Sequence, residues 1–378
     1  MDSILQLGSW VIGTVVPFLF VLTIVVFFHE LGHYLVGRWN GIKIEAFAVG
    51  FGPEIIGYSD KFGTRWKLCA IPLGGYVKFF GNAGVASDPD HEKLAAMDAD
   101  ERDSAYESKK VWQRALVAVA GPVANFILAI VIFAVTFFNN GSFVVDPVVG
   151  TVKEGTAAMD AGFKPGDKII SVDGEAIASF SDLQNAISLS AGNSLRIEVE
   201  RNGIMKELTA TPRMTEQKDR FGNAYSVGIL GISSSSDKSN FRKIEHGVFS
   251  ATSLAVTQTW SVATRTLKFL GQVIVGRQDA SQLRGPVGIA QISSQVATLG
   301  YDRLITLAAV LSVSIGLLNL FPIPMLDGGH LLFYGIEALK GSPLSEKAQE
   351  MGYKFGMLCM LGLMLFATRN DILRLFPG

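Results

Sequence analysis

The residues most able to do chemistry stand at the end of the first apolar run, in the sequence His29-Glu30-Leu31-Gly32-His33. Residues 11–28 contain no charged side chain, so the run is about long enough to cross a bilayer once the next turn is added. Ionisable groups at that depth cost roughly 2.5–3.5 kcal/mol each on insertion scales, and are tolerated mainly where they pair, bind an ion or react. Their position therefore predicts a functional site.

The spacing of the two histidines predicts which chemistry this site performs. Residues four apart lie one turn apart on the same helix face, so His29 and His33 can offer nitrogens to one metal ion. Glu30 then lies beside the metal, where it can take a proton from a water. HExxH is the pattern of zinc metallopeptidases, although it fixes only three positions and also arises by chance. We favour a metal site because an unliganded His-Glu-His after an uncharged span would cost several kcal/mol.

A third ligand is needed, because a catalytic zinc usually takes three protein ligands and leaves a fourth position for water. The candidate is Asp327, which follows an apolar run near the C-terminus. Pro322 and Pro324 interrupt a helix there, while Gly328 and Gly329 allow unusual backbone angles. We expect this break to swing the carboxylate out of the line of the helix.

The expected depth of these residues in the membrane supports Asp327 as the ligand that joins His29 and His33. If the spans at about 11–33 and 304–326 both run from the outside inward, their polar residues lie about 20 positions, or roughly 30 Å, from the outer ends. His330 is a rival ligand, but Asp327 accords better with the break. His91 and His246 stand in polar segments and are expected at the surface.

The composition limits the class of protein. The chain has 378 residues, 49% of them hydrophobic, and a net charge of −1, so it has room for a membrane core and one small soluble domain and gives no electrostatic case for nucleic acid. Cys69 and Cys359 lie far apart without CxxC neighbours and are expected to be unpaired. Residues 1–10 lack the basic region and cleavage site of a secretory signal, so the first apolar run is expected to stay as a membrane helix.

The predicted fold is a polytopic α-helical membrane protein with about four transmembrane helices, an inserted mixed α/β PDZ domain and a small membrane-associated β-hairpin. The spans are expected at about 11–33, 112–138, 304–326 and 350–368. The loop between the first two spans is predicted to be cytoplasmic, because basic residues cluster near both its ends: Arg38, Lys43, Lys109, Lys110 and Arg114. Residues 139–303 would then lie outside the cytoplasm, and the HExxH end of the first span in the cytoplasmic half of the membrane.

Residues 66–80 read as two short strands around a turn at Gly74-Gly75. Such a hairpin offers an edge at which Gly74, Gly75, Tyr76 and Val77 could bind an unwound substrate as an added strand. A structural loop that covers the site is equally compatible with these residues. Nearby, residues 50–53 (GFGP) predict a tight turn or a close backbone approach.

Asn125, in the second span after Gly121-Pro122, needs a polar partner in hydrocarbon. It could join two helices or lie near the metal site, and the residues do not separate these alternatives.

The expected domains are 1–143 and 301–378 for the two halves of the membrane core, 144–213 for the PDZ domain, and 214–300 for a linker with an interfacial amphipathic segment at about 247–276. Residues 154–174 resemble the core of a bacterial PDZ domain. PDZ domains bind extended peptides by strand addition, so the resemblance implies a peptide groove outside the cytoplasm. A domain that only fills space above the membrane is the alternative.

Taken together, HELGH, GFGP, LGGYVKF, GPVANF and NLFPIPMLDGG around an inserted PDZ pattern resemble a bacterial site-2 protease of the RseP type over nearly the whole chain. The resemblance implies that His29, His33 and Asp327 bind one zinc ion, that Glu30 is general base and later proton donor, and that Asn319 helps to hold substrate. It also implies a bacterial inner-membrane enzyme of regulated intramembrane proteolysis. Several relatives carry two PDZ domains in tandem, whereas one is visible here.

The partners that the resemblance implies are single-span membrane proteins, such as anti-sigma factors or remnant signal peptides, after another protease has trimmed their outer part. Two further partners are expected. One is a peptide or substrate segment that binds the PDZ domain, and the other is the lipid bilayer. Two other classes compete: a membrane metal transporter, which would need more polar residues through several spans, and a PDZ scaffold with a degenerate core, which would have a broken HExxH or no aspartate.

Overall fold

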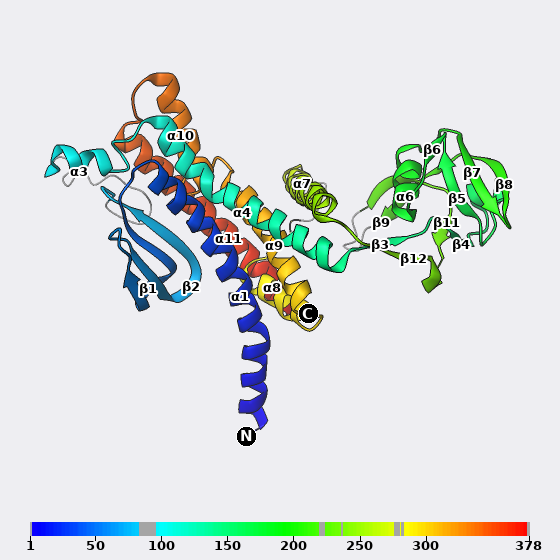
Figure 1. Ribbon diagram of the computed structural model, residues 1–378, viewed down its shortest axis with the longest axis horizontal. Coiled ribbons are helices and arrows are strands. Elements are labelled where there is room, and N and C mark those ends of the chain that lie inside the picture. The colour runs from blue at the N-terminus through cyan, green and yellow to red at the C-terminus, as the bar shows by residue number, and fades with distance from the viewer. Residues whose placement is uncertain are drawn as a thin grey trace. The chain divides into compact units, whose positions relative to one another are not determined.

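The computed structural model describes residues 2–82, 96–218, 224–235, 237–275, 280 and 283–375. The chain divides into two compact units (Figure 1). Unit 1 consists of Met1–Thr136 and Phe249–Gly378, and unit 2 of Phe137–Val248. His91 lies outside the described residues.

Among the described residues, four helices are long and apolar enough to cross a membrane, which confirms the four predicted apolar helices. They are α1 (Asp2–Trp39), α4 (Val111–Asn140), α9 (Tyr301–Asn319) and α11 (Glu346–Leu375). The third ends at Asn319, before the predicted end at 326, because the prolines that follow do not continue a helix.

The described part of unit 1 also has the helices α3 (Ala99–Ser104), α8 (Pro286–Ala297) and α10 (Asp327–Lys340), and nearly all of α7 (Val248–Ile274). The α8 helix begins at Pro286, directly after Gly285. Its first turn is held by the buried carboxylate of Asp371 on α11, which accepts hydrogen bonds from the backbone N–H groups of Gly285 (3.2 Å) and Gly288 (2.8 Å). That α7 lies at a membrane interface stays a prediction.

Small residues let the membrane helices approach closely. A Cβ atom on Gly32 of α1 would stand 2.3 Å from the carbonyl oxygen of Ala120 on α4. A Cβ atom on Gly316 of α9 would stand 3.0 Å from that of Asn125, and Ser312 donates a hydrogen bond of 2.9 Å to the Asn125 carbonyl oxygen. Close backbone contact of this kind replaces the hydrophobic effect as the source of helix association in lipid. It brings α1, α4 and α9 together.

The sheet of unit 1 is formed by β1 (Ile44–Ser59) and β2 (Arg65–Phe79), which are blue in Figure 1 and contact α1. Both strands bend. Residues 44–49 of β1 therefore pair with two segments of β2, 75–79 on one side and 65–68 on the other. The segment 65–68 also pairs with 56–59 of β1. Among the described residues no strand pairs with the outer side of 75–79. This segment is therefore an edge of the sheet.

The predicted hairpin at 66–80 is wrong in its bounds. There is no turn at Gly74-Gly75, because these residues belong to β2 and Gly75 pairs with Val49. The turn that joins the two strands lies instead at residues 60–64, where the N–H of Gly63 donates to the carbonyl oxygen of Asp60 (3.1 Å). Strand β1 bends at residues 50–52, where Gly50 and Gly52 have φ values of +92° and +84°. A Cβ atom on Gly50 would stand 2.9 Å from the carbonyl oxygen of Ile71, which confirms the predicted close approach.

Unit 2 is built from short strands and two helices around one apolar core. A four-stranded sheet has the order β6 (Glu175–Ala176), β5 (Lys168–Val172), β7 (Leu195–Arg201), β8 (Ile204–Ala210). Two-stranded pairs join β3 (Ser142–Val145) to β12 (Phe241–Ile244), β4 (Val149–Val152) to β11 (Ile232–Ser234), and β9 (Arg213–Lys218) to β10 (Ala224–Ile229). The helices are α5 (Ala157–Asp160) and α6 (Phe180–Leu189), and a 3₁₀ turn, η1, covers Lys238–Asn240.

The predicted end of this domain at residue 213 is too early, and the predicted linker from 214 begins inside the unit. Strand β11 pairs with β4, and Leu230 is buried in the same core as Ile169 and Leu183. These strands are short and rich in polar residues, so their local composition resembles that of a loop.

A buried ion pair ties the four-stranded sheet to the loop before it. Arg201 donates two hydrogen bonds to the carboxylate of Asp167 (2.6 and 2.7 Å), which also accepts one from the Lys164 backbone N–H (2.8 Å). Burial alone would raise the pKa of Asp167, but these hydrogen bonds outweigh it and lower that pKa. The carboxylate therefore stabilises the folded unit at neutral pH.

We expect Asp167→Asn to destabilise unit 2 by about 2–4 kcal/mol at pH 7, because the variant leaves Arg201 without its charged partner. In the wild type this contribution is full above the ordinary Asp pKa of about 3.9 and is lost as the pH falls through the lowered pKa. Hydrogen exchange of unit 2 peptides in the full-length protein measures both effects. The matched control is Asp160→Asn, whose exposed pair with Arg213 should contribute under about 1 kcal/mol. Equal losses in the two variants would contradict this account.

Candidate metal centre

The structure brings His29, His33 and Asp327 together. The Nε2 atoms of the two histidines lie 3.3 Å apart. His29 Nε2 lies 3.2 Å from Asp327 Oδ2, and His33 Nε2 lies 3.4 Å from Asp327 Oδ1. Both histidines are buried, and the Asp327 side chain is mostly so. Residues nearly 300 positions apart therefore converge on one point.

Local structure explains why each ligand points there. The two imidazoles stand one turn apart on α1, with their rings edge to face and 4.8 Å between centroids. Asp327 is the first residue of α10, directly after the predicted break. Cβ atoms on Gly328 and Gly329 would stand 2.3 and 2.4 Å from the carbonyl oxygens of Leu320 and Ile323, so the chain can reverse there only with glycine.

The three side chains fit a zinc ion. Ligand atoms 2.0–2.1 Å from a tetrahedral zinc lie about 3.3 Å from one another. The distance between the two histidine Nε2 atoms, and the distance from each of them to its nearer Asp327 oxygen, are close to this value, and with one ligand atom per residue all three lie within 4.8 Å of one another. Asp327 Oδ2 is buried and has no hydrogen-bond partner, although His29 Nε2 is 3.2 Å away. Neutral imidazole nitrogens and a carboxylate present lone pairs to one another, and these lone pairs repel. A cation bound between them removes this repulsion and gives Asp327 Oδ2 a partner.

The outer nitrogens of the imidazoles also have partners. His33 Nδ1 lies 2.8 Å from the carbonyl oxygen of Val117, to which it donates, so its Nε2 keeps a lone pair. Asn125 is fully buried, with its amide 3.3 Å from His29 Nδ1 and its Oδ1 without a partner. A half-turn of this amide puts Oδ1 opposite an N–H at His29 Nδ1, which satisfies the buried oxygen and leaves the lone pair on Nε2. Of the two alternatives that the sequence left open, the structure places Asn125 beside the site.

Gly121 on α4 is a site residue that sequence reasoning missed. A Cβ atom there would stand 2.3 Å from His33 Nε2 and 2.8 Å from His29 Cε1. The only local signal is a glycine inside an apolar helix, next to Pro122 and four residues before Asn125. Its role depends on a contact between helices that the sequence does not encode locally.

The other predicted site residues lie at different distances from the centre. Glu30 lies on the same helix, and a Cβ atom on Gly75 would stand 2.9 Å from its Cγ, so the sheet edge packs against the side chain of Glu30. Asn319, the last residue of α9, has its Nδ2 3.3 Å from His29 Nε2. Gly75 and Asn319 are thus next to the candidate metal centre.

Gly74 and Tyr76 lie against the ring of Phe51, with 6.3 Å between the Tyr76 and Phe51 centroids, and Val77 is buried in the core between the sheet and the helices. Gly75 is therefore the one of the four predicted edge residues for which a contact with Glu30 is found.

The two remaining described histidines have other surroundings. His330 is not part of the three-residue group and lies beside the rings of Tyr334 and Tyr353, at 6.3 and 6.0 Å. His246, in unit 2, makes a hydrogen bond of 2.8 Å with Ser142 Oγ.

We expect Gly121→Ala to weaken zinc binding by roughly tenfold or more, because the added methyl group displaces the imidazoles. Competition with a chelator measures the zinc affinity of the purified protein. The matched control is Gly362→Ala on α11, where an added Cβ atom meets nothing within 4 Å. Equal zinc affinities of the two variants would show that Gly121 does not shape the site.

Comparison with known proteins agrees with this geometry. The model of Peptidase family M50 matches residues 17–363. The chain is 50% identical over 372 residues to the protein named "Putative zinc metalloprotease Atu1380" of Agrobacterium fabrum, covering 98% of this chain and 99% of that one. It is 41% identical over 382 residues to "Metalloprotease MmpA" of Caulobacter vibrioides, covering 95% of each.

Among solved structures, the PDZ domain of an SdrC-like protein from Listeria monocytogenes matches 23% of this chain and 84% of its own, at 22% identity and a TM-score of 0.19. A score at that level carries no argument about the fold. The assignment of unit 2 as a PDZ domain therefore stays a prediction.

A buried histidine pair on an apolar helix, with a carboxylate beside it, forms a candidate metal centre of a membrane protein. The chain belongs to peptidase family M50 and is a zinc metalloprotease of that family. With its four apolar helices it is a multi-pass membrane protein.

Proposed function

We propose that this protein is an intramembrane endopeptidase that hydrolyses peptide bonds within transmembrane helices of single-span membrane proteins. The observation that carries the proposal is the position of His29, Glu30 and His33 within the apolar helix α1, with Asp327 beside the two histidines. A peptidase that acts on soluble chains has no need for a metal centre among membrane-spanning helices, where burying ionisable groups is costly.

In this proposal His29, His33 and Asp327 hold one zinc ion. When bound, zinc lowers the pKa of a water toward neutrality and polarises the scissile carbonyl group. Glu30 accepts a proton from the attacking water and then gives it to the leaving amine. With the lone pair of His29 Nε2 occupied, the amide of Asn319 is free to donate to a carbonyl group of the substrate.

Substrate binding follows from a physical requirement. The amides of a membrane helix are hydrogen-bonded within it, so the helix must unwind before its peptide bond can be attacked. Residues 75–79 form a sheet edge whose Gly75 contacts Glu30, so an unwound segment paired with this edge would have its N–H and C=O groups satisfied next to the catalytic carboxylate. We assign substrate binding to this edge.

The compartments and partners belong to the same proposal. Basic residues near both ends of 40–110 favour a cytoplasmic location for that loop in a bacterial inner membrane, with unit 2 on the other side as a PDZ domain that binds a peptide or substrate segment. The resemblance to site-2 proteases favours anti-sigma factors or remnant signal peptides, trimmed first by another protease, as substrates in regulated intramembrane proteolysis.

Cleavage of a tagged single-span substrate by the wild type and by Glu30→Gln tests the proposal. We expect the variant to keep its zinc and to lose roughly 10²–10⁴-fold in rate, because Gln cannot accept the proton. The control is Glu350→Gln, an exposed carboxylate paired with Lys354 on α11. Equal rates for the wild type and Glu30→Gln would overturn the catalytic assignment.

Proline substitutions test the substrate-binding edge. The N–H groups of neighbouring residues in a strand point to opposite sides, so one of Tyr76→Pro and Val77→Pro removes a donor that faces away from β1. We expect that variant to keep its zinc and to lose most of its cleavage activity. Tyr58→Pro, at the opposite edge of the sheet, is the control and should cleave normally. Wild-type cleavage by both Tyr76→Pro and Val77→Pro would rule out strand addition at this edge.

A further inference from the structure

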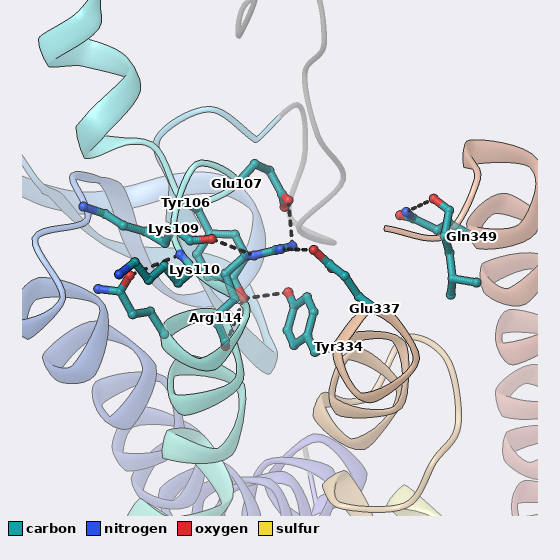
Figure 2. A network of polar contacts seen from close by, with 10 residues as sticks. Tyr106, Glu107, Lys109, Lys110, Arg114, Tyr334, Glu337 and Gln349 are labelled. Atoms are coloured by element: carbon teal, nitrogen blue, oxygen red, sulfur yellow. Dashed lines mark hydrogen bonds and ion pairs between the residues drawn. The ribbon is translucent and has the colours of Figure 1, made fainter. Parts of the chain in front are cut away.

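A buried arginine stands at the start of α4, away from the metal centre. Arg114 is 8% exposed, and its guanidinium pairs with Glu107 (Nη1 to Oε2, 3.3 Å) and with Glu337 (Nη2 to Oε1, 2.6 Å). Figure 2 shows both carboxylates at the guanidinium, one from the loop before α4 and the other from α10. Nε donates to the carbonyl oxygen of Lys109 (3.2 Å), so all three nitrogens are engaged.

Two tyrosines extend this contact. The guanidinium carbon of Arg114 lies 5.0 Å from the ring centroid of Tyr334 on α10. The hydroxyl groups of Tyr334 and Tyr106 lie 2.8 Å apart, and both side chains are buried. Tyr106 in turn stacks on Phe79, at the end of β2, with 4.8 Å between ring centroids. We call Tyr106, Glu107, Arg114, Tyr334 and Glu337 the arginine network.

Stability alone does not explain such a network. Buried ion pairs can often be replaced by apolar residues of similar volume at no cost, whereas removing one partner leaves the other charge unpaired. What the network adds is a fixed geometry between α4 and α10, because a guanidinium that bonds two carboxylates in defined directions has few alternative positions.

The geometry matters because α10 also carries Asp327. Glu337 stands ten residues after Asp327 on one helix, so the two are about 15 Å apart along its axis. A tilt of about 10° at the Glu337 end would move the Asp327 end by about 2.6 Å over that length. Metal–ligand distances tolerate only about 0.2 Å, so the orientation of α10 decides whether Asp327 meets the histidines.

We propose that Arg114 is a positioning residue for the metal centre: by holding Glu337 and Tyr334 it fixes α10 so that Asp327 stays opposite His29 and His33. The inference rests on the proposed role of Asp327 as a ligand. Helix α10 also contacts α11, where the rings of Phe333 and Tyr353 lie 5.8 Å apart. The network and this contact connect α10 to both α4 and α11.

The test compares Glu337→Gln with Glu107→Gln in the full-length protein. Both variants remove one carboxylate charge from the same guanidinium, but Glu337 alone lies on α10. Zinc affinity is measured by competition with a chelator, and the geometry of the ligands by the visible spectrum of the cobalt-substituted protein. Thermal unfolding reports the loss of stability in each variant.

We expect Glu337→Gln to lower zinc affinity by roughly tenfold or more and to shift the cobalt bands. Glu107→Gln should change neither, even if it unfolds at the same lower temperature. Unchanged zinc affinity in Glu337→Gln, or equal changes in both variants, would overturn the positioning role.

Asp327→Asn in the same assays separates this inference from the proposed function. If Asp327→Asn weakens zinc binding and Glu337→Gln does not, the positioning role alone fails. If Asp327→Asn leaves zinc affinity and the cobalt spectrum unchanged, the ligand assignment fails, and the positioning role fails with it.

Discussion

The structure depends on one electrostatic constraint: two imidazoles and a carboxylate meet within 3.4 Å of one another among apolar helices. A cation at its centre stabilises such a group, because two neutral imidazoles and a carboxylate otherwise turn lone pairs toward one another in a medium that solvates them poorly. The close approach of α1, α4 and α9 at small residues, and the reversal that starts α10 at Asp327, are the means by which the chain satisfies this constraint.

The histidine ligands of the site could be predicted from the sequence, because their arrangement depends on the geometry of one helix. The helical period places His29 and His33 on one face, and the apolar run before them makes accident improbable. Asp327 could be proposed because the prolines and glycines around it predict a break, and the structure has a break there. These signals are contained in a dozen neighbouring residues at most.

The rest depends on contacts between distant segments. Gly75 pairs with Val49 in a long antiparallel hairpin that turns at residues 60–64, whereas local composition favoured a turn at Gly74-Gly75. The end of unit 2 was missed because β11 is recognisable only by its pairing with β4. The sequence around Gly121 and Arg114 does not reveal their roles, since a glycine in an apolar helix and an arginine at the start of one are ordinary until the partner helix is known.

Residues at increasing distances from the candidate metal centre keep its ligands in position. Asn125 and the Val117 carbonyl group orient the imidazoles, and Gly121 leaves room for them. The arginine network acts at a greater distance, on the helix that carries the carboxylate. The sheet edge brings Gly75 to Glu30, so the same helix α1 that carries the histidines also borders the place where substrate is proposed to bind.

X-ray absorption at the zinc edge, on the full-length protein in detergent, tests the central claim most directly. One zinc per chain is predicted, with two imidazole nitrogens at about 2.0–2.1 Å and a carboxylate oxygen at about 2.0–2.2 Å. In Asp327→Asn the carboxylate contribution should weaken while both imidazoles remain. A shell without two imidazoles, or one with sulfur at about 2.3 Å from Cys69 or Cys359, would contradict the account.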